Sequence, residues 1–317
     1  MDLQHMSTAR NWIQASRMRT LPLAAACVMI GAAVGHDSAL QDEVTCGRFW
    51  WVFAGIMATV LVLQILSNYA NDLGDSLNGA DDHTRKDRAV ASGRISPRAM
   101  RLAVLASALM ALVLGVSTVA YALWDTGNLL AFILLVGLGA LAIVAAYKYT
   151  AGRNPYGYKG LGDLMVFLFF GWIGVGGTAF LLSHTWSWTW LIPGTFSGAL
   201  GVSVLNLNNL RDHEKDAAAG KRTWVTRMGF EGAKKYHLSL FVTAWCSFLI
   251  YFLGIESGRW SGMIWMGLIA LVHLRHLVDV WHQKNPAALD PELKKIALST
   301  AVVALFLLMS AVNYPVS

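Results

Sequence analysis

The chain has 317 residues, of which 56% are hydrophobic and only 14% are charged, with a formal net charge of +6. A soluble domain carries about 25% charged residues, so the composition excludes an ordinary soluble protein and favours a membrane protein. The three cysteines (Cys27, Cys46 and Cys246) have neither metal-binding nor disulfide-framework spacing, which argues against a cysteine-based site.

Nine segments of the chain are apolar enough to cross a bilayer. In chain order they are about 20–36, 49–68, 102–124, 128–147, 162–182, 189–207, 237–255, 260–280 and 295–313. None of them alternates with period two, so a membrane β-barrel is excluded. Tryptophans at segment ends, such as Trp51 and Trp124, are typical of the membrane interface. The sequence therefore predicts an all-α polytopic membrane protein with one domain over residues 1–317.

The positive charges indicate the orientation of these segments. The first segment follows three arginines and would also suit a cleaved signal peptide. If it is retained, residues 1–19 form an N-terminal segment that shares one side with 69–101, 148–161, 208–236 and 275–295. These pieces hold 23 of the 25 lysines and arginines, and only Arg48 and Arg259 lie opposite. Because positive residues accumulate on the cytoplasmic side, we expect this side to be cytoplasmic, in the bacterial inner membrane, and the charge does not indicate nucleic-acid binding.

A polar stretch, "SNYANDLGDSLNGADD" (67–82), directly follows the second apolar segment. Asn68 and Asp72 are four residues apart, as are Asn71 and Asp75, so each pair lies on one face of a helix. Basic residues, including Arg88, follow the stretch.

The loop after the fourth segment, "YKYTAGRNPYGYKGLGD" (147–163), contains four tyrosines. Aromatic rings such as that of Tyr149 can flank a carbocation or an aromatic substrate. The alternative is that these tyrosines only anchor the helix end at the membrane interface.

A second polar cluster follows the sixth segment, on the same predicted side. "NNLRD" (208–212) matches "NDLGD" (71–75) 137 residues earlier, and Asn208, Asp212 and Asp216 form a stripe with helical spacing. Lys221 follows this cluster as Arg88 follows the first.

Facing rows of carboxylates repel each other and are costly to desolvate near a bilayer, so we expect a cation between them. Oxygen ligands without a cysteine or histidine set favour Mg²⁺, which commonly takes phosphate oxygens as further ligands. The basic residues suit diphosphate oxygens. Apolar helices behind such a site fit a substrate with a diphosphate head and a long apolar tail, which describes a prenyl diphosphate.

The two clusters resemble the paired aspartate-rich motifs of the UbiA-type intramembrane prenyltransferases. The resemblance covers most of the chain, and within the family it is nearest to the branch that prenylates 1,4-dihydroxy-2-naphthoate. The stretches that carry it are 17–33, 63–82, 88–100, 154–178 and 204–223. It implies nine transmembrane helices around a central cavity open to the cytoplasm, with Mg²⁺ as cofactor.

The implied reaction moves a polyprenyl chain from polyprenyl diphosphate onto 1,4-dihydroxy-2-naphthoate, with loss of CO₂ and diphosphate, to give demethylmenaquinol in menaquinone biosynthesis. By the same resemblance, four carboxylates bind the metal and act in catalysis: Asp72, Asp75, Asp212 and Asp216. The implied substrate-binding residues are Asn68, Asn71, Asn208, Arg88, Tyr149, Arg153 and Lys221. The family pattern has Asp where this chain has Gly79, so a further ligand is Asp81, Asp82 or neither.

Two other interpretations remain open at this point. The same fold could prenylate another aromatic acceptor, such as 4-hydroxybenzoate or a phytyl-type quinone precursor. Intramembrane acids also mark ion paths in transporters, but transporters place them near the bilayer midplane rather than at helix ends. Three histidines near the end of the eighth segment (His273, His276 and His282) are predicted to be surface imidazoles rather than metal ligands.

Overall fold

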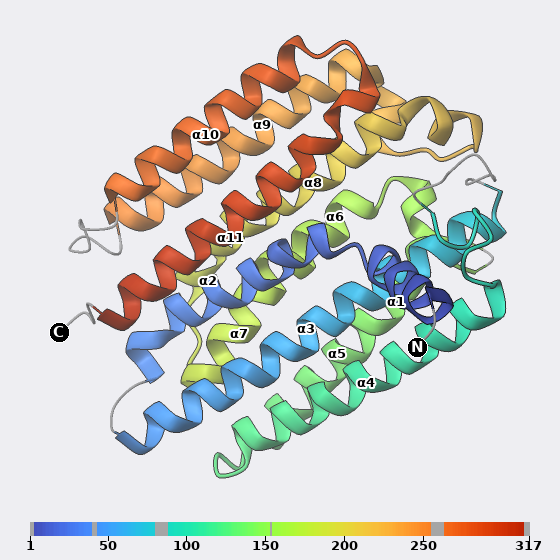
Figure 1. Cartoon of the computed structure of the whole chain (residues 1–317). Coiled ribbons are helices and arrows are strands. Elements are labelled where there is room, and N and C mark those ends of the chain that lie inside the picture. The colour runs from blue at the N-terminus through green and yellow to red at the C-terminus, as the bar shows by residue number, and fades with distance from the viewer. Residues whose placement is uncertain (1–2, 40–42, 80–87, 153, 255–262, 314–317) are drawn as a thin grey trace.

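The computed structural model describes residues 3–39, 43–79, 88–152, 154–254 and 263–313, and gives the backbone alone for 3–8, 37–38, 43–46 and 263–265. All regular structure within these ranges is helical (Figure 1). The all-α prediction is therefore confirmed.

The long helices coincide with the predicted segments, because each apolar run satisfies its own backbone hydrogen bonds as a helix. A short helix, α1 (Leu3–Ala15), precedes them. The helices in chain order are α2 (Leu21–Ala39), α3 (Glu43–Leu77), α4 (Pro97–Leu123), α5 (Leu129–Lys148), α6 (Gly162–Phe167) with α7 (Ile173–Ser183), α8 (Leu191–Ala218), α9 (Trp224–Gly254), α10 (Met263–His282) and α11 (Asp290–Asn313). A π-helical turn, η3 (Leu168–Trp172), joins α6 to α7.

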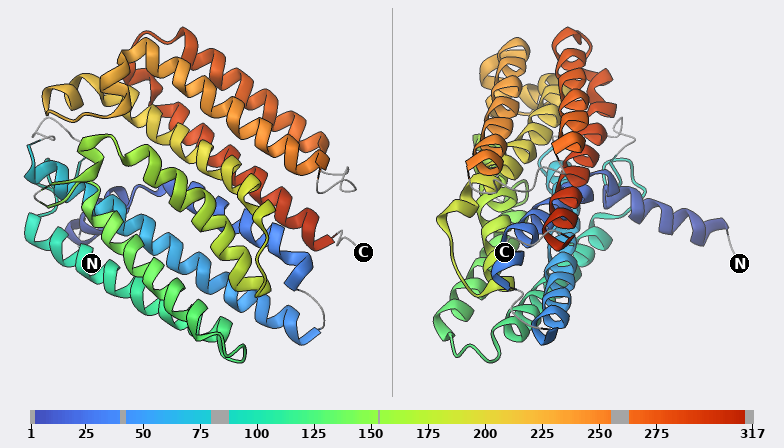
Figure 2. Two further views of the ribbon diagram at one scale, coloured as in Figure 1. Left: turned by 180° about the vertical axis from the view of Figure 1, so that it is seen from behind. Right: turned by 90° about the vertical axis from the view of Figure 1, so that its left-hand side faces the viewer.

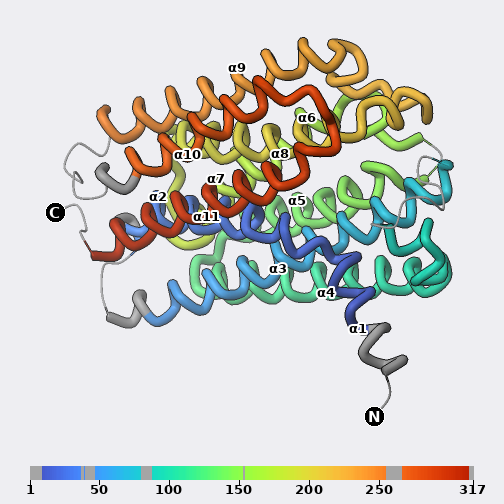
Figure 3. Tube along the Cα trace, turned by 45° about the horizontal axis from the view of Figure 1, so that its top comes forward, coloured from blue at the N-terminus to red at the C-terminus, as the bar shows by residue number. Residues whose placement is uncertain are grey.

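Within the described ranges, eight of the nine predicted spans are long and apolar enough to cross a membrane. The ninth, predicted at 260–280, corresponds to α10, which begins at Met263 beside residues outside the described ranges. The helices lie side by side in one bundle (Figure 3), in which α8 packs against α9 and α11, α2 against α11 and α7, and α3 against α4. α1 projects from the bundle (Figure 2).

A small apolar cluster fixes the polar end of α3. Leu66, Ala70 and Leu73 on α3 pack against Val90 and Met100, which flank the turn before α4. This turn ends at a sharp helix start, where the Ser96 side chain accepts a hydrogen bond from the backbone N–H of Ala99 and Pro97 occupies the first turn. The cluster therefore holds the backbone of residues 89–90 beside the acidic face of α3.

The prediction that His273 and His276 are surface imidazoles is wrong. Both are buried on α10, with exposed fractions of 1% and 0%. The Nε2 atom of His273 lies 2.8 Å from Ser299 Oγ. His276 contacts His237 Nε2 at 2.8 Å and Glu292 at 2.5 Å. Buried imidazoles are stable where their ring nitrogens find partners, as these do. His282 is exposed, as predicted.

Candidate active site

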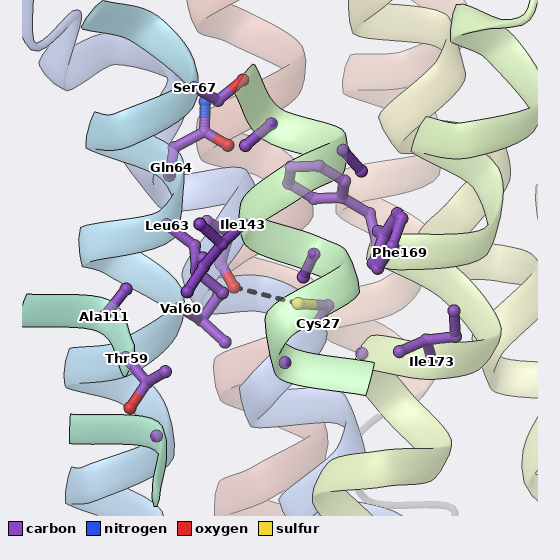
Figure 4. Close-up of a pocket in the computed structure, with 18 of the residues that line it drawn as sticks. Cys27, Thr59, Val60, Leu63, Gln64, Ser67, Ala111, Ile143, Phe169 and Ile173 are labelled. Carbon is purple, nitrogen blue, oxygen red and sulfur yellow. Dashed lines mark hydrogen bonds between the residues drawn. The ribbon is translucent and has the colours of Figure 1, made fainter. Parts of the chain in front are cut away.

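A cavity of about 340 Å³ opens within the bundle between α2, α3, α4, α5, the α6–α7 pair and α8 (Figure 4). Along α3 its wall runs from Asn71 to Ile56. The fifteen rises of about 1.5 Å between these two residues span about 22 Å, so the cavity is elongated along the bundle. Its walls are mostly apolar, with Leu63, Phe169 and Ile173 among them, and polar residues gather at one end. Such a shape suits a molecule with a polar head and a long apolar tail.

The first motif lies at the polar end, on the last turns of α3. Asp72 and Asp75 are both buried, with exposed fractions of 1% and 3%. Asp72 accepts hydrogen bonds from the backbone N–H groups of Ala89 at 2.9 Å and Val90 at 3.5 Å. Asp75 accepts one from the Tyr158 hydroxyl at 3.0 Å. These contacts hold both carboxylates in fixed orientations despite their burial.

Two cations pair with Asp75. Arg88 Nη2 lies 3.3 Å from its Oδ2 atom, and Lys221 Nζ lies 3.0 Å from its Oδ1 atom. Lys221 also reaches Asp216 Oδ1 at 3.2 Å, so one ammonium group joins the two predicted motifs. Burial opposes the charge of Lys221, but Asp75 and Asp216 outweigh burial and raise the pKa of this ammonium group above its ordinary value.

The asparagines of the first motif line the cavity, whereas the four aspartates of the two motifs are not among its lining residues. Asn68 donates to the backbone carbonyl of Ser16 at 2.8 Å, and Asn71 accepts from the Thr150 hydroxyl at 2.9 Å. Asn208, from the second motif, lines the same polar end. Asn68 and Asn71 are three residues apart and therefore share one face of α3, which lines this cavity.

The second motif lies on the last turns of α8. Asp216 is buried, whereas Asp212 is partly exposed. Arg211 binds both carboxylate oxygens of Asp212, through Nε at 3.1 Å and Nη2 at 2.8 Å. Among the described residues, no three acidic, histidine or cysteine side chains already form a metal-binding group. Asp75, Asp212 and Asp216 are instead paired with basic side chains.

Tyr149 contributes an aromatic wall to the cavity. Its ring packs edge-on against Tyr156, with centroids 5.5 Å apart. Burial raises the pKa of Tyr149 well above its ordinary value and that of Tyr156 to about 12, so both hydroxyls stay protonated. Arg153, the predicted partner of Tyr149, lies outside the described residues, as do Asp81 and Asp82.

The geometry and a comparison with known proteins agree on the class of protein. The model of the UbiA prenyltransferase family matches residues 21–298. The chain belongs to the UbiA prenyltransferase family. Two curated 1,4-dihydroxy-2-naphthoate octaprenyltransferases are similar to it: that of Haemophilus influenzae is 35% identical over 294 residues, and that of Escherichia coli is 34% identical over 295 residues. In each case the match covers 92% of this chain and 92% of the relative.

More distant relatives support the family at the level of the fold. The 2-carboxy-1,4-naphthoquinone phytyltransferase of Synechocystis is 26% identical over 223 residues, covering 70% of this chain and 67% of that protein. A solved structure of digeranylgeranylglyceryl phosphate synthase superposes with a TM-score of 0.56 over 96% of this chain and 99% of the other, at 15% identity. The UbiA fold is thus shared at low sequence similarity.

One residue of this UbiA-family site was missed from the sequence. Arg17 lies before α2 with left-handed backbone angles (φ 48°, ψ 59°), which are uncommon for a residue other than glycine. Its side chain lines the polar end of the cavity, where its positive charge is attracted by the carboxylates of Asp72 and Asp75. Its Nη2 atom is buried and has no hydrogen-bond partner among the described residues. The sequence indicated only a positive residue that helps to set the membrane orientation, because no regular spacing connects Arg17 with the distant motifs.

Proposed function

We propose that this chain transfers a polyprenyl chain from polyprenyl diphosphate to 1,4-dihydroxy-2-naphthoate, with loss of CO₂ and diphosphate, to give demethylmenaquinol for menaquinone biosynthesis. The observation that carries the proposal is an elongated apolar cavity whose polar end is lined by asparagines of both motifs, next to the aspartates that Lys221 joins. The curated relatives with this activity align along nearly the whole chain.

The residues at the polar end fit a magnesium–diphosphate head group. Asp72, Asp75, Asp212 and Asp216 supply the oxygen ligands that Mg²⁺ prefers. Mg²⁺ held there would neutralise charge that develops on the leaving diphosphate. The buried Nη2 atom of Arg17, which has no hydrogen-bond partner within the described ranges, is a donor suited to a phosphate oxygen.

Basic side chains beside the acids complete the head-group site. Lys221 and Arg88 are both held within reach of Asp75, so a diphosphate bound there would meet two further cations. Electrostatic stabilisation of this kind is usually the largest contribution to a reaction that develops charge on a leaving group. Asn68, Asn71 and Asn208 supply neutral polar contacts around the same end of the cavity.

The apolar part of the cavity would hold the tail and exclude water. As the carbon–oxygen bond to diphosphate breaks, its electron pair goes to the leaving group and an allylic cation remains. The electron-rich naphthoate ring then forms the new carbon–carbon bond, and the displaced carboxylate leaves as CO₂. Walls such as Phe169 and Leu63 keep water from capturing the cation. Tyr149 presents its ring to this part of the cavity and would flank the acceptor or the cation.

We place this end of the bundle on the cytoplasmic side of the membrane. The loop segments that close the site, at 154–161 and 219–223, belong to the arginine- and lysine-rich pieces of the chain. The backbone N–H of Arg222 donates to the carbonyl of Tyr158 at 2.9 Å and ties these two loops together. Both substrates would then reach the site from the cytoplasm or from the adjoining leaflet.

The test is an assay of purified protein in lipid vesicles with a labelled long-chain prenyl diphosphate and Mg²⁺. One arm contains 1,4-dihydroxy-2-naphthoate and the other 4-hydroxybenzoate. We expect prenylated product with the naphthoate alone, lost with EDTA and in Asp72→Ala and Asp212→Ala proteins. Product with hydroxybenzoate instead would keep the chemistry but overturn the acceptor. No product with either ring, in protein that is folded, would refute the proposal.

A further inference from the structure

A chain of ion pairs joins the second motif to a helix that does not line the cavity. Asp290 stands at the start of α11. Arg211 on α8 donates to it through Nη1 at 2.5 Å, and Arg19 donates to both of its oxygens at 2.8 Å. Arg211 at the same time binds both oxygens of Asp212. The series of ion pairs Arg19–Asp290–Arg211–Asp212 therefore connects three places: the turn just before α2, the first residue of α11 and the last turns of α8.

The Arg211–Asp212 end of this series of ion pairs is shielded from water, unlike an ordinary surface ion pair. The side chain of Arg211 is 13% exposed and that of Asp212 is 17% exposed, whereas Asp290 is 47% exposed. Arg211 uses the planar fork of its guanidinium group on Asp212 and its remaining Nη1 edge on Asp290. Since a guanidinium group is rigid and planar, fixing one edge on Asp290 fixes the plane that the other edge presents to Asp212.

We infer that Asp290 is a positioning residue for the metal-binding end of the site: it holds Arg211, and Arg211 orients the carboxylate of Asp212. The inference rests on the proposed function, in which Asp212 is a magnesium ligand. Side chains that orient a metal-binding residue typically change metal affinity 10–100-fold when they are removed. Without Asp290, Arg211 would place its whole charge on Asp212 and compete with a divalent cation for that carboxylate.

A merely structural role of Asp290 predicts a different result. An acidic residue in the first turn of α11 stabilises the helix through its dipole, and its loss would lower thermal stability without changing metal affinity. A matched control is Asp279, which also bridges two cations, Arg275 at 3.0 Å and Lys295 at 3.3 Å, but has no contact with the motifs among the described residues.

The experiment measures Mg²⁺ affinity directly on the full-length protein. The readout is the rise in unfolding temperature as Mg²⁺ is titrated with a non-reactive prenyl thiodiphosphate, alongside the Mg²⁺ dependence of turnover. We expect Asp290→Asn to need about 10-fold more Mg²⁺ for half-saturation, with turnover at saturating Mg²⁺ reduced less than about threefold. Asp279→Asn should match the wild type.

Arg211→Lys, alone and combined with Asp290→Asn, tests whether Asp290 acts through Arg211. The lysine variant removes the fork, so Asp290→Asn should add little in that background. Unchanged Mg²⁺ affinity in Asp290→Asn, or effects of the two substitutions that simply multiply, would overturn the inference. Asp212→Ala distinguishes failure of this inference from failure of the proposed function. If Asp212→Ala loses Mg²⁺ affinity while Asp290→Asn keeps it, only the role of Asp290 is refuted. If Asp212→Ala binds Mg²⁺ normally, the proposed metal site is refuted.

Discussion

Lys221 is the residue whose removal should perturb the site most clearly. Its ammonium group pairs with Asp75 at 3.0 Å and with Asp216 at 3.2 Å, and its side chain is only 13% exposed. Lys221→Met keeps the length of the side chain and removes the charge. Asp216 then loses the cation with which it pairs, while Asp75 keeps Arg88 and the Tyr158 hydroxyl.

The loss of stability follows from this burial. Removing one partner of a buried ion pair costs about 3–5 kcal/mol, because the other charge stays desolvated and unpaired. We expect the lower end, about 3 kcal/mol, since Asp75 keeps two partners and Asp216 is near the aqueous end of α8. For soluble domains each kcal/mol lowers the unfolding midpoint by about 2–4 °C, so a fall of roughly 6–12 °C is expected.

The assay is thermal unfolding in detergent followed by tryptophan fluorescence, with Lys215→Met as control. Lys215 is exposed on α8 one residue before Asp216, and its substitution should change stability by less than about 0.5 kcal/mol. Mg²⁺ should stabilise Lys221→Met more than the wild type, because two carboxylates have lost a competing cation. An unchanged midpoint, or equal stabilisation by Mg²⁺, would refute the reasoning that this lysine bridges the motifs.

The pH dependence of this effect has a definite sign. The pKa of Lys221 is raised in the folded protein, so its stabilisation is fully present below the unfolded pKa, near about 10.4, and is lost only as pH rises through the folded value. The difference in unfolding midpoint between the wild type and Lys221→Met should therefore stay constant from about pH 7 to about pH 9. A difference that narrows within this range would show that another group carries the effect.

Two further predictions concern glycines. Gly139 lines the cavity, and a Cβ added there would meet no atom of the described residues within 4 Å. Gly139→Phe should therefore fill tail space and lower kcat/KM about tenfold or more for an octaprenyl donor relative to a farnesyl donor. Gly137 has the same open surroundings but is not among the residues that line the cavity, so Gly137→Phe should leave the ratio of kcat/KM between the two donors unchanged. The same ratio in both variants would contradict the assignment of this part of the cavity to the prenyl tail. On α3, a Cβ at Gly74 would lie 2.6 Å from the Thr150 carbonyl oxygen. Gly74→Ala should thus lower stability by about 1–3 kcal/mol in the unfolding assay, with Gly137→Ala as control, and a wild-type midpoint would count against this close contact.

Much of the fold could be predicted because a membrane helix is recognisable from local sequence, as a run of apolar residues long enough to cross the bilayer. The spacing of Asn68, Asn71, Asp72 and Asp75 is likewise a local property, and a helix turns it directly into a shared face. The proximity of Lys221 to the second motif could also be predicted, since it follows that motif closely in sequence. The ion pairs by which it joins Asp216 to Asp75 could not be predicted, because they depend on how α8 and α3 pack.

The residues that escaped prediction act through tertiary contacts. Tyr158 reaches Asp75 only because its loop folds back over the end of α3. His273 and His276 had the sequence context of a solvated helix end, yet ring-nitrogen partners on other helices keep them buried. Arg17 carries no spacing signal at all. Each of these contacts depends on which helices and loops are neighbours in the folded protein, and the periodicity of the sequence does not reveal that.

The arrangement of charge explains how four carboxylates coexist at the end of an apolar bundle. Asp75 is matched by Arg88 and Lys221, Asp216 by Lys221 and Asp212 by Arg211, whereas Asp72 accepts hydrogen bonds from the backbone N–H groups of Ala89 and Val90. Within the described residues, each of the four carboxylates therefore has a partner before any ligand arrives. A magnesium–diphosphate head group itself brings charges of both signs, and binding it can exchange partners rather than add net charge. Removing the partner of a buried charge is strongly destabilising, so an exchange of partners avoids leaving a carboxylate unpaired when the head group binds. Arg17, whose Nη2 atom has no partner in the part of the chain that the structure describes, is then the donor that gains most from the phosphate oxygens.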